Sequence, residues 1–189
     1  ALCDAPFAAE QAELQRAEVC FNFLEQFSRG KVIYGINTGF GPLAQHYVEP
    51  RDAEKLQYNL VRSHAAGAGP ALPSSVVRAM LLTRLTTFLK GRSGVSLPVI
   101  ARMQLLLQGN ILPEVPEHGG VGASGDLTQQ AHLGLGIIGE GFCHHDGHRR
   151  PMAEVLKERD LAPVPLRLRD GLAIVNGTAC MTGLGLSNV

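Results

Sequence analysis

The sequence predicts a mainly α-helical domain with a few short β-strands around a glycine-rich loop. Apolar residues recur every three or four positions in several stretches that end at glycine, which is typical of helices packed on a core. The β-prone runs between them are short and interrupted by proline and glycine, so they do not predict a large sheet. Hydrophobic residues make up 45% of the chain and charged residues 18%, which is enough apolar material for a packed core.

Helices account for most of the predicted elements. The first covers residues 9–28 and ends at Gly30, a natural C-terminal cap. Residues 31–34 are β-prone and lead into a glycine-punctuated loop, 35–41. Four further helices start at residues that favour helix N-termini: Asp52 to about Ala66, Ser74 or Ser75 to Gly91, Pro98 to Gly109, and Asp126 to about Ile138.

The last part of the chain is predicted to be less regular. Residues 139–151 form a loop or hairpin, 152–159 a short helix and 160–170 an extended segment. A last helix begins near Asn176. Residues 181–189 keep an apolar pattern without a helix-stop signal, and residue 1 is Ala rather than Met, so we expect a piece of a longer chain.

Composition excludes several classes of protein. Lys and Arg together number 17, as do Asp and Glu, so the basic surplus of a nucleic-acid binder is absent. The sequence has no apolar run of about 18 residues and no basic-then-apolar signal at its start, so we expect neither a membrane span nor a signal peptide. Four cysteines with no zinc or CxxC spacing predict reduced thiols in a cytoplasmic protein: Cys3, Cys20, Cys143 and Cys180.

Two short motifs have interpretations that the context disfavours. Residues 120–125 fit the G-x-G-x-x-G pattern of dinucleotide-binding turns, but they follow Pro113 and Pro116, and a segment with two prolines is a poor central strand. Without further context, the three glycines indicate only a loop in which the chain turns tightly. Residues 144–148 contain three histidines, but they lie too close together for a metal site and predict a solvated turn, so we expect no metal.

Six blocks of sequence, taken together, resemble the histidine and phenylalanine ammonia-lyase family. They occur in the family's order across nearly the whole chain: 34–41, 59–67, 90–94, 119–127, 131–133 and 170–178. Family members are much longer, so the chain resembles roughly their first third to two fifths. The resemblance implies a cofactor-forming domain over 1–175 and the start of a central long-helix bundle over 176–189.

The resemblance implies that Ala123, Ser124 and Gly125 cyclise without a helper enzyme into a methylidene-imidazolone, with no external cofactor. The amide nitrogen of Gly125 attacks the carbonyl of Ala123, two waters are lost, and the Ser124 side chain becomes an exocyclic methylidene. Gly125 lacks a Cβ, so its nitrogen can reach backward in a compressed turn. Asp126 would cap the next helix and steady the loop, and nearby helix N-termini would stabilise negative charge on the ring oxygen.

The resemblance also assigns roles outside the tripeptide. Tyr34 is the candidate base that removes the β-proton of the substrate, although its interpretation without the motif is a half-buried strand tyrosine. Asn176 matches the asparagine that contacts the electrophile or substrate, and it is also a candidate helix N-cap. Ser63 and His64 resemble the Ser-His pair of histidine lyases, where other lyases more often carry His-Leu or Phe-Leu. Alternatively, His64 is a core histidine.

These residues together imply a full-length homotetramer that eliminates ammonia from L-histidine to give urocanate. The chain departs from the family's pattern at several positions, which puts the substrate in doubt: Arg92, Gly120, Ala179 and residues 128–130, where Thr-Gln-Gln replaces Ala-Pro-Leu. Phenylalanine or tyrosine ammonia-lyase and 2,3-aminomutase remain alternatives. An alternative outside the enzymes is an inert helical fragment that only associates with partner chains.

Overall fold

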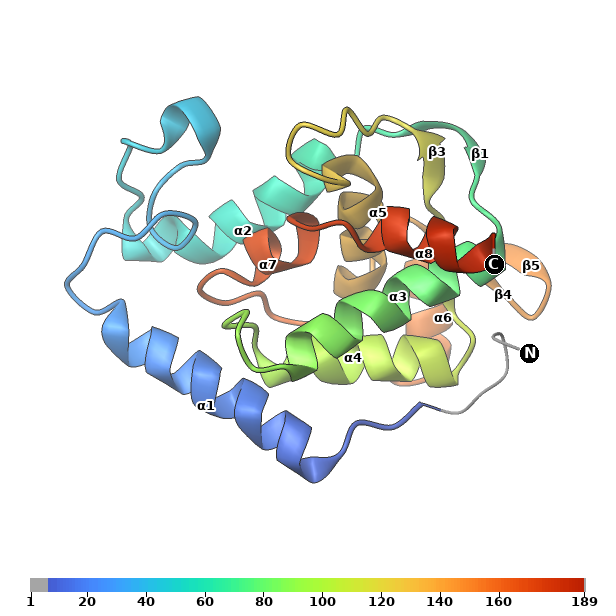
Figure 1. Cartoon of the computed structure of the whole chain (residues 1–189), viewed down its shortest axis with the longest axis horizontal. Coiled ribbons are helices and arrows are strands. Elements are labelled where there is room, and N and C mark those ends of the chain that lie inside the picture. Colours follow the sequence, from blue (N-terminus) through green and yellow to red (C-terminus); the bar gives the residue numbers. More distant parts are fainter. Residues whose placement is uncertain (1–6, 189) are drawn as a thin grey trace.

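The computed structural model describes residues 7–188 and is mainly α-helical, as the sequence predicts (Figure 1). One 3-10 turn, η1, covers Gly41–Leu43. The α-helices are α1 (Gln11–Phe27), α2 (Pro50–His64), α3 (Ser74–Leu89), α4 (Leu97–Gln108), α5 (Leu127–Ile138), α6 (Met152–Glu158), α7 (Asp170–Val175) and α8 (Ala179–Ser187). None of these helices combines the length and apolar character needed to cross a membrane.

The strands are short and form two small antiparallel sheets. One sheet pairs β1 (Ala68–Ala71) with β3 (Pro116–His118), and β3 leads directly into the glycine loop. The other has the order β2-β4-β5, from Leu112–Pro113, Phe142–His145 and His148–Pro151. The β4–β5 pair is the hairpin expected within 139–151. The predicted strands around the glycine loop are therefore confirmed on its N-terminal side.

The core is built around α3, whose buried face contacts helices from both halves of the chain. Met80, Leu81 and Leu85 are fully buried on it, and burying a side chain of this size contributes roughly 1.5–3 kcal/mol. α8 packs along α3, and α7 lies against α2 and α5 (Figure 1). The helix before residue 176, α7, is thus held by α2 and α5, and the helix after it, α8, is held by α3.

The expected strand over 31–34 is wrong. The Asn37 side chain accepts the amide of Ile33 at 2.7 Å and donates to the carbonyl of Lys31 at 2.7 Å. These contacts satisfy the backbone of the segment locally, so it forms a turn in place of a ladder. Beyond it, Thr38 makes a single antiparallel bridge with Tyr47.

Several predicted helix starts are displaced. α2 begins at Pro50, so Asp52 lies within its first turn and does not cap it. α3 begins at Ser74 behind Pro73, without a side-chain cap from either serine. α4 begins at Leu97, one residue before Pro98. In each case proline occupies the helix boundary, and its fixed φ favours that position without a capping side chain.

The last predicted helix begins three residues later than expected, and an unpredicted helix precedes it. α7 ends at Val175 with Asn176 at its C-cap, and α8 starts only at Ala179, so Asn176 is not the expected N-cap. All six residues of α7 are buried. A helix that is buried on every face shows no apolar periodicity in its sequence, which is why α7 was not predicted.

Candidate active site

The glycine loop that contains Ala123, Ser124 and Gly125 is exposed along most of its length, with Val121 91% exposed. Gly122 and Gly125 adopt left-handed backbone conformations, φ +79° and +90°, which residues with a Cβ rarely adopt. The first turn of α5 holds its N-terminal arm: the Thr128 hydroxyl donates to Gly119 O at 2.9 Å, and the Gln129 amide donates to Glu117 O at 3.1 Å. Of the departures from the family's pattern, Thr128 thus binds the loop backbone and Gln129 binds the end of β3 just before it.

The C-terminal arm of the loop rests on Gly177. The Asp126 amide donates to Gly177 O at 2.8 Å, and a Cβ on Gly125 would lie 2.5 Å from the same oxygen. Glycine is therefore required at position 125 by both space and conformation. This contact places Asn176, the residue before Gly177, close to the tripeptide.

Asp126 caps a helix, but not the one expected. It occupies the N-cap position of α5 without a side-chain cap bond to that helix. Its carboxylate accepts the amide of Met181, in the first turn of α8, at 2.8 Å. The N-terminus of α8 lies close to Asp126 because the loop rests against residues 177–178. Asp126 therefore steadies the loop by joining it to α8.

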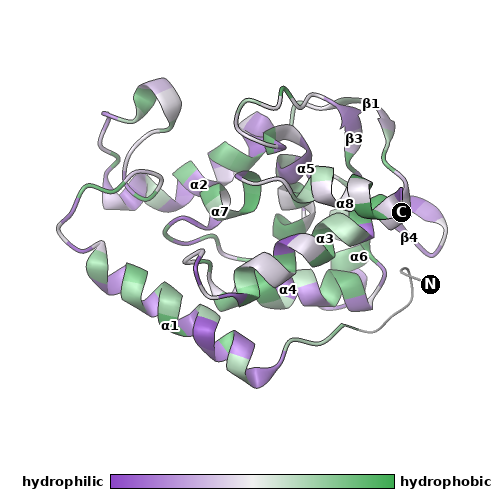
Figure 2. Cartoon of the chain, viewed as in Figure 1, coloured by the Kyte–Doolittle hydropathy of each residue, from purple (hydrophilic) through white to green (hydrophobic). Residues whose placement is uncertain are grey.

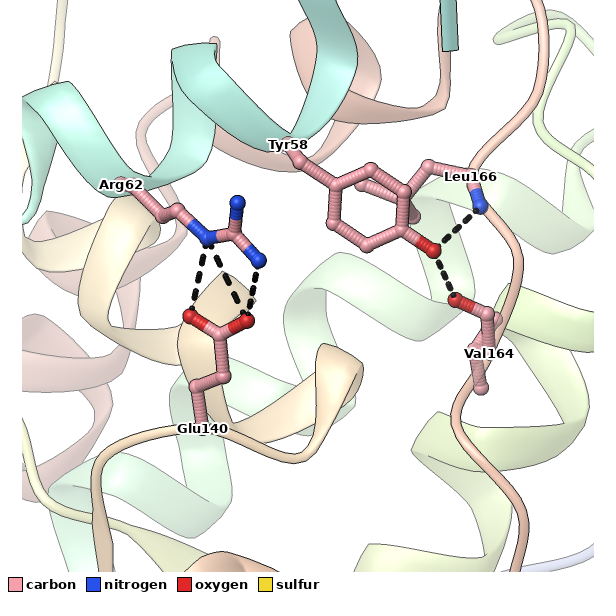
Figure 3. A network of polar contacts seen from close by, with 5 residues as sticks. All are labelled: Tyr58, Arg62, Glu140, Val164 and Leu166. Carbon is pink, nitrogen blue, oxygen red and sulfur yellow. Dashed lines mark hydrogen bonds and ion pairs between the residues drawn. The ribbon is translucent and has the colours of Figure 1, made fainter. Parts of the chain in front are cut away.

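The helix α2 carries Ser63 and His64 at its C-terminal end. Polar contacts of Tyr58 and Arg62 fix this helix (Figure 3). Arg62 donates to the Glu140 carboxylate, with the shortest contact at 2.6 Å. One turn earlier, the Tyr58 hydroxyl donates to Val164 O at 3.0 Å and accepts the amide of Leu166 at 3.4 Å. These contacts tie α2 to the α5–β4 turn and to the extended segment before α7.

The contacts of His64 favour one tautomer. Nδ1 lies 2.9 Å from Leu60 O and 3.1 Å from the Ser63 hydroxyl. A carbonyl oxygen can only accept, so Nδ1 carries the proton, and Nε2 of the neutral ring is a hydrogen-bond acceptor. His64 is half-buried, so it is neither the fully buried core histidine of the alternative interpretation nor a freely solvated one.

His132 is a site residue that the sequence interpretation did not single out. Its Nε2 accepts the amide of Gly67 at 3.0 Å, and Gly67 packs against the Gly119 backbone, since a Cβ on Gly119 would lie 3.2 Å from the Gly67 Cα. Burial lowers the pKa of His132, with Glu114 opposing the shift, which favours the neutral ring that this bond requires. His132 thereby joins the end of α2 to the start of the glycine loop.

Tyr34 lies in a separate loop that packs on α7. Its side chain is 50% exposed, its hydroxyl accepts the Gly41 amide at 3.3 Å, and its ring contacts Phe40 edge-on. Gly35 beside it packs on Leu172 and accepts the Gln57 amide at 3.2 Å. α7 thus carries the Tyr34 loop near its start and Asn176 at its end, but the hydroxyl does not hydrogen-bond to the tripeptide in this chain.

The histidines of 144–148 lie in the β4–β5 hairpin, on another part of the molecule. Across residues 7–188, no group of three or more His, Cys, Asp or Glu side chains is placed to hold a metal ion. Cys20, Cys143 and Cys180 are free thiols, and Cys3 lies outside the described residues.

The family model for aromatic amino acid lyase matches residues 1–189. The chain belongs to this family. Histidine ammonia-lyase of Geobacillus thermodenitrificans is 42% identical to it over 182 residues, which are 96% of this chain and 36% of that protein.

Solved structures of the family share the fold. Tyrosine aminomutase from Streptomyces globisporus has a TM-score of 0.91 at 36% identity, covering 97% of this chain and 35% of its own. Histidine ammonia-lyase from Trypanosoma cruzi has a TM-score of 0.85 at 31% identity, covering 94% and 35%. The chain therefore spans about a third of the length of these relatives.

Proposed function

We propose that this chain is the electrophile-forming part of an amino acid ammonia-lyase that converts L-histidine to urocanate and ammonia. The observation that carries the proposal is the Ala123-Ser124-Gly125 turn, with Gly125 in a left-handed conformation against the Gly177 carbonyl. Membership of the aromatic amino acid lyase family supports it.

The tripeptide has the atoms that a methylidene-imidazolone requires. The Gly125 nitrogen bonds to the Ala123 carbonyl carbon, and the carbonyl oxygen leaves as water with the amide protons of Gly125 and Ser124. Ser124 then loses its hydroxyl and its α-proton as a second water, which leaves a carbon–carbon double bond. The exposed loop leaves room for this change, and Gly125, free of a Cβ, fits beside Gly177.

Once formed, the group supplies an electrophilic carbon that activates the amino acid for loss of ammonia. The chain's own residues then bind and orient the substrate. Tyr34, open to solvent on one side, takes the β-proton, and Asn176 beside Gly177 contacts the electrophile or substrate. The N-terminus of α8, beside the loop, favours negative charge there.

Ser63 and His64 are the residues that select the amino acid. With Nδ1 committed to Leu60 O, the His64 Nε2 accepts a hydrogen bond, and the imidazole of L-histidine offers an N–H donor that phenylalanine lacks. A buried ring nitrogen without a partner costs about 1–3 kcal/mol. Histidine ammonia-lyases among the relatives agree with this choice.

A 2,3-aminomutase is the second candidate, favoured by the likeness to tyrosine aminomutase. A mutase uses the same electrophile but returns the ammonia to the β-carbon. Analysis of the products from labelled L-histidine, L-tyrosine and L-phenylalanine separates the two, because only a mutase gives a β-amino acid.

The whole protein is proposed to be a cytoplasmic homotetramer that acts on a small amino acid, with residues 1–175 as the cofactor-forming domain and 176–189 as the start of the central bundle. Family active sites combine residues from several subunits. The alternative is an inert chain that only associates with partners, and turnover by the full-length protein excludes it.

Intact mass spectrometry tests the electrophile directly. We expect the mass to be short by two waters and the peptide map to place the loss within 123–125. An ordinary Ser124 in the peptide map contradicts the proposed function.

A further inference from the structure

Arg84 is a charged residue on the apolar stripe of α3. Its side chain is only 6% exposed, and burial, together with the nearby Arg169, lowers its pKa to about 10. The guanidinium therefore stays protonated at neutral pH, although it forms no ion pair with any residue of 7–188. A buried charge is costly unless its donors are satisfied, so the partners of Arg84 indicate its role.

The partners of Arg84 are backbone carbonyls at the end of α7. Its Nη2 donates to Ala173 O and, at 2.5 Å, to Asn176 O. The last carbonyls of a helix have no partner within it and carry partial negative charge, which suits a cation. Arg84 therefore fixes the point where the chain leaves α7 and enters residues 176–178.

Gly177 lies directly between Arg84 and the tripeptide. A Cβ on Gly177 would overlap Arg84 Nη1, so the glycine backbone lies flush on the guanidinium. On its other side, the Gly177 carbonyl accepts the Asp126 amide at 2.8 Å and meets Gly125. The Arg84 guanidinium, the Gly177 peptide and the C-terminal arm of the glycine loop therefore stack in this order.

We propose that Arg84 is a positioning residue for formation of the electrophile. By fixing the Asn176–Gly177 peptide, it holds the surface that keeps the Gly125 amide nitrogen in the turn from which it attacks Ala123. The inference rests on the proposed function, because it concerns the same ring closure. Residues 120–124 are exposed and have no hydrogen bond to residues 7–188 outside the loop, so the anchor at Gly177 controls how often the turn is reactive. Misplacement by about 1 Å can slow such a reaction roughly 100-fold.

Arg102 on α4 is a matched control. It is 5% exposed and also donates to two backbone carbonyls, Ile137 O at 3.2 Å and Ala162 O at 2.5 Å. Neither carbonyl belongs to the glycine loop or to residues 176–178. Arg84→Met and Arg102→Met thus each remove a buried guanidinium that holds two carbonyls, but only the first is next to the tripeptide.

The experiment follows the loss of two waters over time after cell-free synthesis of the chain, by intact mass. We expect Arg102→Met to react at the wild-type rate and Arg84→Met roughly 10- to 100-fold more slowly. Arg84→Lys, which keeps the charge but not the planar fork, should be intermediate. Hydrogen exchange at the Asp126 amide should be faster in Arg84→Met than in Arg102→Met, while amides of α4 serve as an internal reference.

Equal rates of water loss in the two methionine variants overturn the role of Arg84. If Arg84→Met does not fold, Gly177→Ala replaces it, because its Cβ displaces the guanidinium without removing it. Gly136→Ala, crowded by Pro113 away from the loop, is its control. A wild-type chain that loses no water contradicts the proposed function itself, whereas a modified wild type with an unaffected Arg84→Met contradicts only this inference.

Discussion

Ser124 lies in the exposed part of the glycine loop and makes no hydrogen bond to residues 7–188. Ser124→Ala should therefore prevent the loss of the second water, which takes the Ser124 hydroxyl, while changing the free energy of unfolding by no more than about 0.5 kcal/mol. Intact mass and urea unfolding measure the two effects, with Ser75→Ala, exposed at the start of α3, as the control. A mass still short by two waters contradicts the role of this hydroxyl.

His64 should control which amino acid the full-length protein prefers. Wild type should favour L-histidine over L-phenylalanine and L-tyrosine, because the His64 Nε2 accepts from the imidazole N–H. His64→Leu should reduce kcat/KM for histidine roughly 10-fold more than for phenylalanine.

Ser63→Ala tests the other member of the pair separately, since it leaves the imidazole and its bond to Leu60 O in place. Steady-state kinetics on the three amino acids provide the measurement. An equal reduction of kcat/KM for all three amino acids in His64→Leu would mean that His64 does not recognise the substrate ring. A wild-type preference for tyrosine or phenylalanine would mean the same.

At the scale of elements, α7 connects the two loops of the site, and Asp170 anchors its start. The carboxylate is fully buried and accepts the Ser96 amide at 2.8 Å, the Ser96 hydroxyl at 2.7 Å and the Arg167 amide at 2.8 Å. Burial raises the pKa of Asp170 to about 6, although these hydrogen bonds oppose the shift. α7 is thereby fixed to the start of α4.

The raised pKa of Asp170 predicts a pH dependence of stability. The folded chain binds this proton more tightly than the unfolded chain does, since the ordinary pKa is 3.8. The contribution of Asp170 to the free energy of unfolding is therefore largest below about pH 4 and falls by on the order of 3 kcal/mol as the pH rises to about 6. Asp170→Asn should remove this fall.

Urea unfolding of wild type and Asp170→Asn across pH 4 to 7 measures the difference. Ser96→Ala, which removes one donor to the carboxylate, raises the pKa of Asp170 further and should make the fall larger than in wild type. Parallel profiles for wild type and Asp170→Asn would falsify the linkage.

At the scale of the whole molecule, apolar side chains remain exposed on α1 and α8. Hydrophobic residues recur along both helices (Figure 2). Val19, Phe23 and Phe27 share one face of α1, and Phe23 and Phe27 stack on each other. On α8, Met181, Leu184 and Leu186 are exposed, while Val189 lies outside the described residues. The formal net charge is zero, so charge repulsion does not oppose association.

The chain should therefore self-associate. Sedimentation at increasing concentration should show species larger than a monomer, and Leu186→Lys with Met181→Lys should reduce them. Phe23→Lys tests the α1 face separately. A monomer of the unsubstituted chain at high concentration contradicts this expectation.

The sequence alone determined the helical class and most helix positions, and it located the glycine loop at residues 119–125. Local signals carry this information, because apolar periodicity reports the buried face of a helix and glycine reports its end. The resemblance of six sequence blocks to known lyases identified the family correctly. Local signals failed at 31–34, where the Asn37 side chain satisfies the backbone, and at α7, which is buried on every face.

Only the tertiary structure decided which groups meet. Asp126 follows the loop in sequence, yet it caps α8, because the chain returns there after α7. Arg84 lies among the buried apolar residues of α3, but its partners are 89 and 92 residues away. Contacts at such separation depend on how the helices pack, and neither periodicity nor capping within one segment encodes that packing.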